Sequence, residues 1–172
     1  MSHDALGFSE SQWEVLKHGP LYMLAQVGGA DSYIDSAEWT ALLDLVSASA
    51  ASDDQLIATL MSELGEQLHH GKTQIPNHHS PLEGLFEIGR ILDEWDAGAS
   101  LAYRVALMEI GATVGDASGA QLTIRYAVHH GNDHWLPSPA TSPAEHRALA
   151  AAAAALGLAV PAGPASETPA AG

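Results

Sequence analysis

The sequence predicts an all-α protein of about six helices, and two observations support this. Apolar residues recur at steps of three and four along separate segments between residues 9 and 158, as on one face of a helix. Several of these segments begin with a capping residue followed three positions later by Gln or Glu, and stretches rich in Gly, Pro and Asn separate them. We therefore expect one bundle over residues 8–158, built from two related halves, 9–70 and 80–158, with a linker at 71–79.

The first half contains three predicted helices. The first spans about residues 9–27 and is expected to kink or restart at Pro20, because proline lacks the amide hydrogen that a helix interior needs. The second follows a capping box formed by Asp35 and Glu38. The third opens at Ser52 and stops near residues 69–71.

The second half begins with Ser80-Pro81, a cap followed by proline at the first helical position. A further helix is expected over about residues 100–115, with one face that carries Leu101, Val105, Met108 and Ala112. The last helix starts at Thr141-Ser142-Pro143 and runs to Leu158. Residues 116–141 are compatible with helix, strand or loop, and the tail 159–172, rich in Pro, Ala and Gly, is expected to be disordered.

The composition excludes several classes of function. Its 21 acidic against 6 basic residues give a net charge of −15, which opposes binding to nucleic acid or anionic membranes and favours cations or a basic protein partner. There is no cysteine, so disulfides and thiolate chemistry are excluded. No signal peptide or long apolar run is visible, and we expect a cytoplasmic protein without membrane insertion.

One segment carries a family resemblance. Residues 29–38, Gly-Ala-Asp-Ser-Tyr-Ile-Asp-Ser-Ala-Glu, follow a helix with an Asp-containing turn, then Ile-Asp and a Glu. This pattern resembles the TerB-like family, named for a tellurite-resistance protein, and the resemblance extends over roughly residues 12–158. Ser32 stands where the family prefers Gly. The resemblance implies a helical bundle of two related halves, acidic residues near a pseudo-twofold axis that bind a divalent cation, and a setting in tellurite or other stress responses.

The acidic residues that the resemblance places at such a site are Asp31, Asp35 and Glu38 in the first half and Asp116 and Glu145 in the second. Carboxylate oxygens are the ligands that calcium and similar hard cations require. The alternative is that several of these side chains cap helices and complement helix dipoles. The residues alone do not decide between a cation site and capping.

A second candidate metal site is a loop that holds His129, His130, Asp133 and His134 within six residues. Imidazole and carboxylate groups suit zinc or a related ion. The alternative is that these are exposed loop histidines that point in different directions.

Motifs for catalysis are scarce. The sequence has no nucleophile elbow, no phosphate-binding glycine loop and no cysteine nucleophile. Glu66 and His69 form one Glu-x-x-His pair, but a di-metal bundle needs two such pairs. We therefore expect a binding module rather than an enzyme. Its alternatives are a purely structural or scaffolding helical protein without metal, and a metal-dependent enzyme that uses the His-rich loop.

Overall fold

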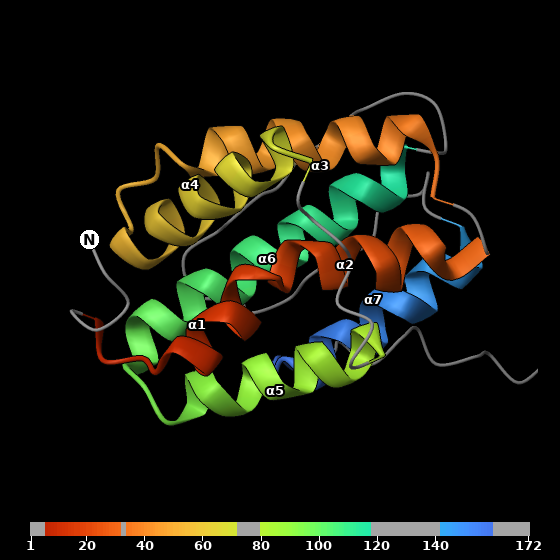
Figure 1. The fold of residues 1–172 in the computed structure, drawn as a ribbon. Coiled ribbons are helices and arrows are strands. Elements are labelled where there is room, and N and C mark those ends of the chain that lie inside the picture. Colours follow the sequence, from red (N-terminus) through yellow and green to blue (C-terminus); the bar gives the residue numbers. More distant parts are fainter. Residues whose placement is uncertain (1–5, 32–33, 72–79, 118–141, 160–172) are drawn as a thin grey trace, which may run out of the picture.

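The computed structural model describes residues 6–31, 34–71, 80–117 and 142–159. Within these ranges the chain is all α, with no strand, as the sequence predicts (Figure 1). The elements are α1 (Glu10–Lys17), α2 (Gly19–Val27), the 3-10 helix η2 (Gly28–Asp31), α3 (Ser36–Ser49), α4 (Gln55–His69), α5 (Pro81–Asp93), α6 (Ala97–Ala117) and α7 (Pro143–Ala155).

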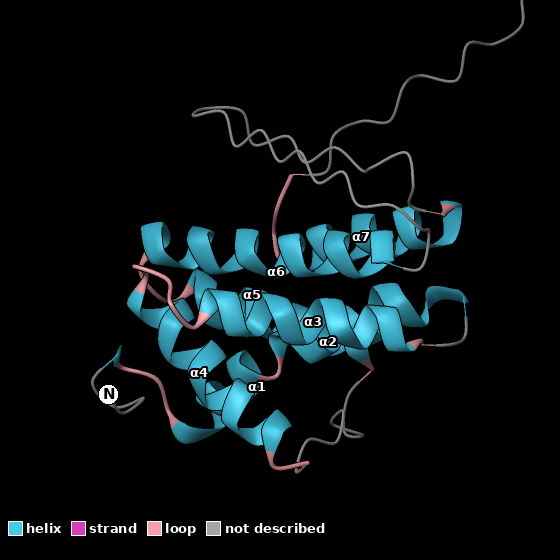
Figure 2. Ribbon diagram, turned by 90° about the horizontal axis from the view of Figure 1, so that it is seen from above, coloured by secondary structure: helices cyan, strands magenta, loops and turns pink. Residues whose placement is uncertain are grey.

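Helix α6 is the centre of the bundle and contacts α2, α3, α4, α5 and α7. Figure 2 shows α6 and α7 on one side of the bundle and α1 and α4 on the opposite side. Buried apolar side chains from all seven α-helices form one continuous hydrophobic core. The two predicted halves therefore share a single core rather than forming separate units.

The halves pack in related ways. Helix α3 contacts both α2 and α6, and α7 likewise contacts both α6 and α2. Helix α4 packs on α3, and α5 packs on both α2 and α7. The order along the chain differs, because α4 follows α3 whereas α5 precedes α6. The two halves therefore resemble each other in how some of their helices pack, but not in the order of those helices along the chain.

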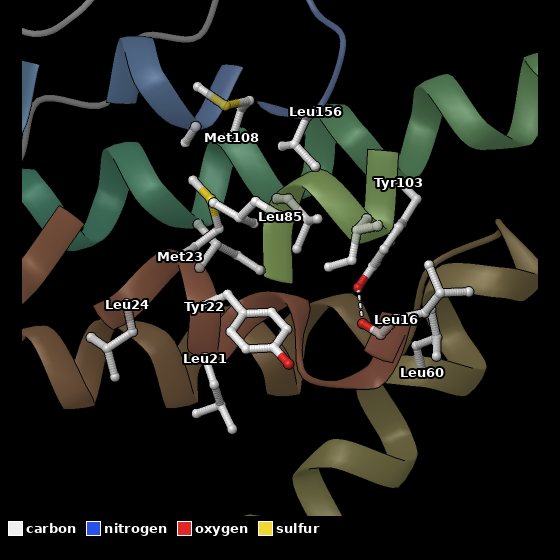
Figure 3. Close-up of a cluster of buried hydrophobic side chains, with 14 of the residues drawn as sticks. Leu16, Leu21, Tyr22, Met23, Leu24, Leu60, Leu85, Tyr103, Met108 and Leu156 are labelled. Atoms are coloured by element: carbon white, nitrogen blue, oxygen red, sulfur yellow. Dashed lines mark hydrogen bonds between the residues drawn. The ribbon is translucent and has the colours of Figure 1, made fainter. Parts of the chain in front are cut away.

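The predicted restart at Pro20 is confirmed, because α1 ends at Lys17 and α2 begins at Gly19 with Pro20 in its first turn. The break leaves the carbonyl of Leu16 available to accept a hydrogen bond from the buried hydroxyl of Tyr103 at 2.5 Å (Figure 3). Gly19 makes room for this contact, since a Cβ atom there would lie 2.6 Å from the Tyr103 oxygen. The bond joins α1 to the central helix.

Two predicted helix starts are wrong by a few residues. Asp54, not Ser52, caps α4, because its carboxylate accepts from the Ile57 amide at 3.0 Å. Helix α6 begins at Ala97, three residues earlier than expected. Asp96 accepts from the amides that follow it and so starts the helix.

Helix α7 begins as predicted, with Ser142 as its cap. It ends at Ala155, before the expected Leu158, and Gly157 follows with a φ of +71°. This left-handed conformation is common just after a helix, and glycine adopts it without strain.

The predicted inward face of α6 is half wrong. Met108 and Ala112 are buried, but Leu101 and Val105 are 46% and 42% exposed. The residues buried most deeply on this helix lie elsewhere on its circumference: Tyr103, Leu107, Ile110 and Val114. Because α6 meets neighbours on several sides, a nearly uniform apolar sequence does not reveal which face is free.

Other predictions lie outside the described residues. These concern the linker from residue 72 to 79, the chain from 118 to 141 and the tail from residue 160 onward. Among the described helices, none has the length and apolar character needed to cross a membrane.

Candidate functional site

Three buried carboxylates mark one end of the bundle, which we call the acidic end and define by Glu38, Asp116 and Glu145. Their exposed fractions are 1%, 8% and 4%. At this end α2 and α6 finish and α3 and α7 begin (Figure 1). The 3-10 helix η2 contacts both α6 and α7 there, so it connects the two halves.

Glu38 is the third residue of α3 and completes the predicted capping box. The Asp35 carboxylate accepts from the Ala37 and Glu38 amides at 2.7 and 2.9 Å, and Glu38 Oε2 accepts from the Asp35 amide at 2.7 Å. The other carboxylate oxygen, Oε1, faces Gly28, where a Cβ atom would lie only 2.8 Å away and 3.1 Å from Val114 Cγ1. The Glu38 carboxylate is therefore enclosed between the end of α2 and the last turns of α6.

Glu145 repeats this arrangement in the second half. Its Oε2 accepts from the Ser142 amide at 2.6 Å, and Ser142 Oγ accepts from the Glu145 amide at 3.2 Å. Glu83 makes the same two bonds with Ser80 at the start of α5, yet Glu83 is exposed. Capping therefore accounts for these backbone hydrogen bonds, but it does not explain why two of the three glutamates are buried.

Asp116 lies in the last turn of α6, where the helix dipole carries partial negative charge. A buried carboxylate at that position is unfavourable unless hydrogen-bond donors or a cation offset its charge. Asp116 is therefore the third buried acid of the acidic end.

A metal ion at the acidic end would need ligands in addition to Glu38, Asp116 and Glu145. In the part of the chain that the structure describes, no three His, Asp or Glu side chains are grouped so that they could hold a metal ion. Asp31 closes η2 at the acidic end, but its side chain lies outside the described part. The alternative loop, with His129, His130, Asp133 and His134, lies outside it as well.

A second polar region, on α4, is a shallow surface pocket of about 340 Å³ lined by Glu63, Glu66, Gln67 and His70. Beside it, Glu63 accepts from the Trp13 indole at 2.8 Å and lies 3.9 Å from the ammonium of Lys17. Lys17 is buried and also pairs with Glu14. Sequence reasoning missed this buried lysine, because nothing in its local pattern distinguishes it from a surface residue at the end of a helix.

Three comparisons with known proteins, against family models, curated proteins and solved structures, find no match to this chain. The TerB-like resemblance therefore rests on the residues of the sequence, and the geometry of the acidic end has to support any function by itself.

Proposed function

We propose that this chain is a TerB-like helical binding module of the cytoplasm that binds a divalent cation, calcium or similar, at its acidic end. We further propose that it binds a protein partner in a tellurite or stress-response setting and has no enzymatic activity. The observation that carries the cation proposal is the burial of Glu38 and Glu145, against the exposure of Glu83 in an equivalent capping box.

The physical reason is the cost of burying like charges. Carboxylates removed from water lose hydration free energy, and several at one end of a bundle also repel each other. A bound hard cation offsets both terms and takes oxygen ligands of this kind. In this proposal the ligand set is drawn from Asp31, Asp35, Glu38, Asp116 and Glu145. Ion binding has to draw these side chains together, because no three His, Asp or Glu side chains among the described residues are grouped to hold a metal ion.

Isothermal titration calorimetry with calcium, magnesium, manganese and zinc tests this proposal. We expect the wild type to bind at least one of these ions, and we expect Asp31→Asn/Asp116→Asn to abolish the binding. Glu83→Gln removes a carboxylate from an exposed capping box and is the matched control, so it should bind like the wild type. An absence of binding by every ion would refute a cation site at the acidic end.

A double variant of the loop, His130→Ala/His134→Ala, separates the two candidate metal sites. Zinc binding that this variant loses, and that the acidic variant keeps, would move the site to the loop. That result would reopen the hypothesis of a metal-dependent enzyme, which also requires turnover that depends on His129, His130 or His134.

The net charge of −15 supports a basic surface on the protein partner. Complex formation driven by charge should weaken steeply as ionic strength rises, because salt screens exposed charges beyond about 10 Å at 0.1 M. Analytical ultracentrifugation of the protein with a captured partner at low and high salt measures this. An affinity that does not change with salt would contradict the proposed basic character.

The second candidate function is a structural or scaffolding helical module without metal. It is favoured by the capping boxes, which already engage the Glu38 and Glu145 carboxylates with backbone amides. For this function we expect the melting temperature to be the same in excess EDTA and in excess calcium. A rise with calcium would instead support the cation site, because a ligand that binds only the folded state stabilises it.

A further inference from the structure

A second concave site lies away from the acidic end, where α5 ends, α6 begins and the chain leaves α7. It is a pocket of about 280 Å³ with walls formed largely by Leu92, Trp95, Leu101 and Leu158, and with Arg104 and Asp93 as its charged residues. Arg104 lies in the second turn of α6, whereas the acidic end lies at the last turn of this 21-residue helix. At 1.5 Å per residue, the twelve residues from Arg104 to Asp116 separate the two sites by about 18 Å along the helix.

The guanidinium of Arg104 is buried and held from three sides. Nη1 donates to the Leu156 carbonyl at 2.6 Å, and Nη2 donates to the Gly89 carbonyl at 3.1 Å and to Asp93 Oδ1 at 2.5 Å. The third nitrogen, Nε, is also buried and has no hydrogen-bond acceptor. A buried donor without an acceptor is unfavourable, so the unpaired Nε calls for an explanation.

The acid that pairs with Arg104 is held much less firmly than the arginine. The Asp93 side chain is 70% exposed, whereas that of Arg104 is 8% exposed. Asp93 can therefore turn into water at small cost, while Arg104 stays in place through its two carbonyl bonds. Nε has almost no accessible surface in the structure, so Asp93 has to turn away before Nε and Nη2 can present the parallel pair of N–H groups that a carboxylate accepts in bidentate fashion.

We propose that this pocket binds a small apolar carboxylate, whose two oxygens accept from Arg104 Nε and Nη2 in place of Asp93. The apolar body of the ligand would lie against Leu92, Trp95 and Leu158. The volume of about 280 Å³ lies just below the usual range for small-molecule pockets, so the ligand has to be small, about ten non-hydrogen atoms, such as an arylacetate. This site is independent of the cation proposed at the acidic end.

The test is an NMR titration of the full 15N-labelled chain with phenylacetate and, separately, with its neutral analogue phenylacetamide. We expect saturable shifts of the Ser100 and Gly157 amides with the acid and none with the amide. Asp93→Asn removes the competing carboxylate and should tighten phenylacetate binding by about two- to fivefold, the range for loss of one exposed ion pair.

Asp44→Asn is the matched control, because it removes the same charge from an exposed position on α3 and should leave the affinity unchanged. Leu101→Asp places a negative charge in the pocket wall at a partly exposed position and should abolish the shifts in a chain that stays folded. Arg104 itself is left intact, since its loss would also remove the bonds to Leu156 and Gly89 that join α5, α6 and α7.

Three results would each overturn the proposal: no saturation with phenylacetate in either the wild type or Asp93→Asn, equal binding of phenylacetamide, or equal affinities for Asp93→Asn and Asp44→Asn.

Discussion

Replacement of Gly89 by alanine tests how closely α5 and α7 approach. Gly89 is buried in α5, and a Cβ atom built on it would lie 2.6 Å from the Ala155 carbonyl oxygen and 3.5 Å from Leu156 Cα. Because the first of these contacts is with backbone, no rotation of a side chain relieves it. Insertion of a methyl group therefore has to push α7 away from α5.

Two opposing contributions determine how far Gly89→Ala changes the free energy of unfolding. Alanine is favoured over glycine in a helix interior by about 1 kcal/mol. Overpacking costs about 1–3 kcal/mol, and a clash with backbone belongs at the upper end of that range. The Arg104 bonds to the Gly89 and Leu156 carbonyls would also be strained. We expect Gly89→Ala to destabilise the fold by about 1–2 kcal/mol, or to lower Tm by about 2–8 °C for a chain of this length.

Gly65 provides the control on α4. A Cβ atom there would lie 3.7 Å from Val46 Cγ1, an ordinary van der Waals contact. Gly65→Ala should therefore gain the helix preference without a clash and stabilise the fold by about 0.5–1 kcal/mol. Urea denaturation followed by circular dichroism measures both variants. The reasoning fails if Gly89→Ala proves as stable as Gly65→Ala, because the close approach of α5 and α7 would then not exist.

Three further predictions concern stability. Burial raises the pKa of the Tyr103 phenol, so the unfolded state releases this proton at lower pH than the folded state, and the free energy of unfolding should fall above about pH 10 by up to about 1.4 kcal/mol per pH unit. Urea titrations at pH 8 to 11 should show a shallower fall for Tyr103→Phe. Identical curves for the two proteins would contradict the burial of this phenol. Thermal melts should show that Glu38→Ala costs about 1–2 kcal/mol more than Glu83→Ala. Only Glu38→Ala opens a cavity and removes the acceptor of a part-buried amide. Equal losses would refute the special position of the acidic end. Leu107→Ala should lower the free energy of unfolding, measured by urea denaturation, by about 2–5 kcal/mol, and Leu101→Ala by less than about 0.5 kcal/mol, since only Leu107 is fully buried. Similar losses would mean that the buried and exposed faces of α6 are misassigned.

The parts of the fold that sequence predicts well are those with local causes. The capping boxes at residues 9, 35, 80 and 142 form as expected, because a cap is made by side chains and amides within four residues. The break before Pro20 has the same local origin. The starts of α4 and α6 are the exceptions. At α4, Ser52 and Asp54 are both good caps and the local pattern does not rank them.

At the candidate site, too, the local features could be predicted and the tertiary ones could not. Capping by Asp35, Glu38 and Glu145 was one of the two alternatives that the sequence offered, and these hydrogen bonds are present. The burial of Glu38 and Glu145 and the exposure of Glu83 could not be predicted, because all three follow the same local pattern of a cap and an acid.

The role of Arg104 lay wholly outside the reach of sequence reasoning. Its partners are Gly89, Asp93 and Leu156, which come from two other parts of the chain. Nothing near Arg104 in the sequence distinguishes it from an exposed arginine on a helix surface.

By itself, then, the sequence determined that this chain is helical, where most of its helices start, and how strongly acidic it is. Each of these depends on composition or on interactions within a few residues. Only the tertiary structure decided which helix ends meet, which carboxylates are buried and which face of α6 is free. Those properties depend on close packing between segments far apart in the chain, and helical periodicity marks an apolar face without saying what covers it.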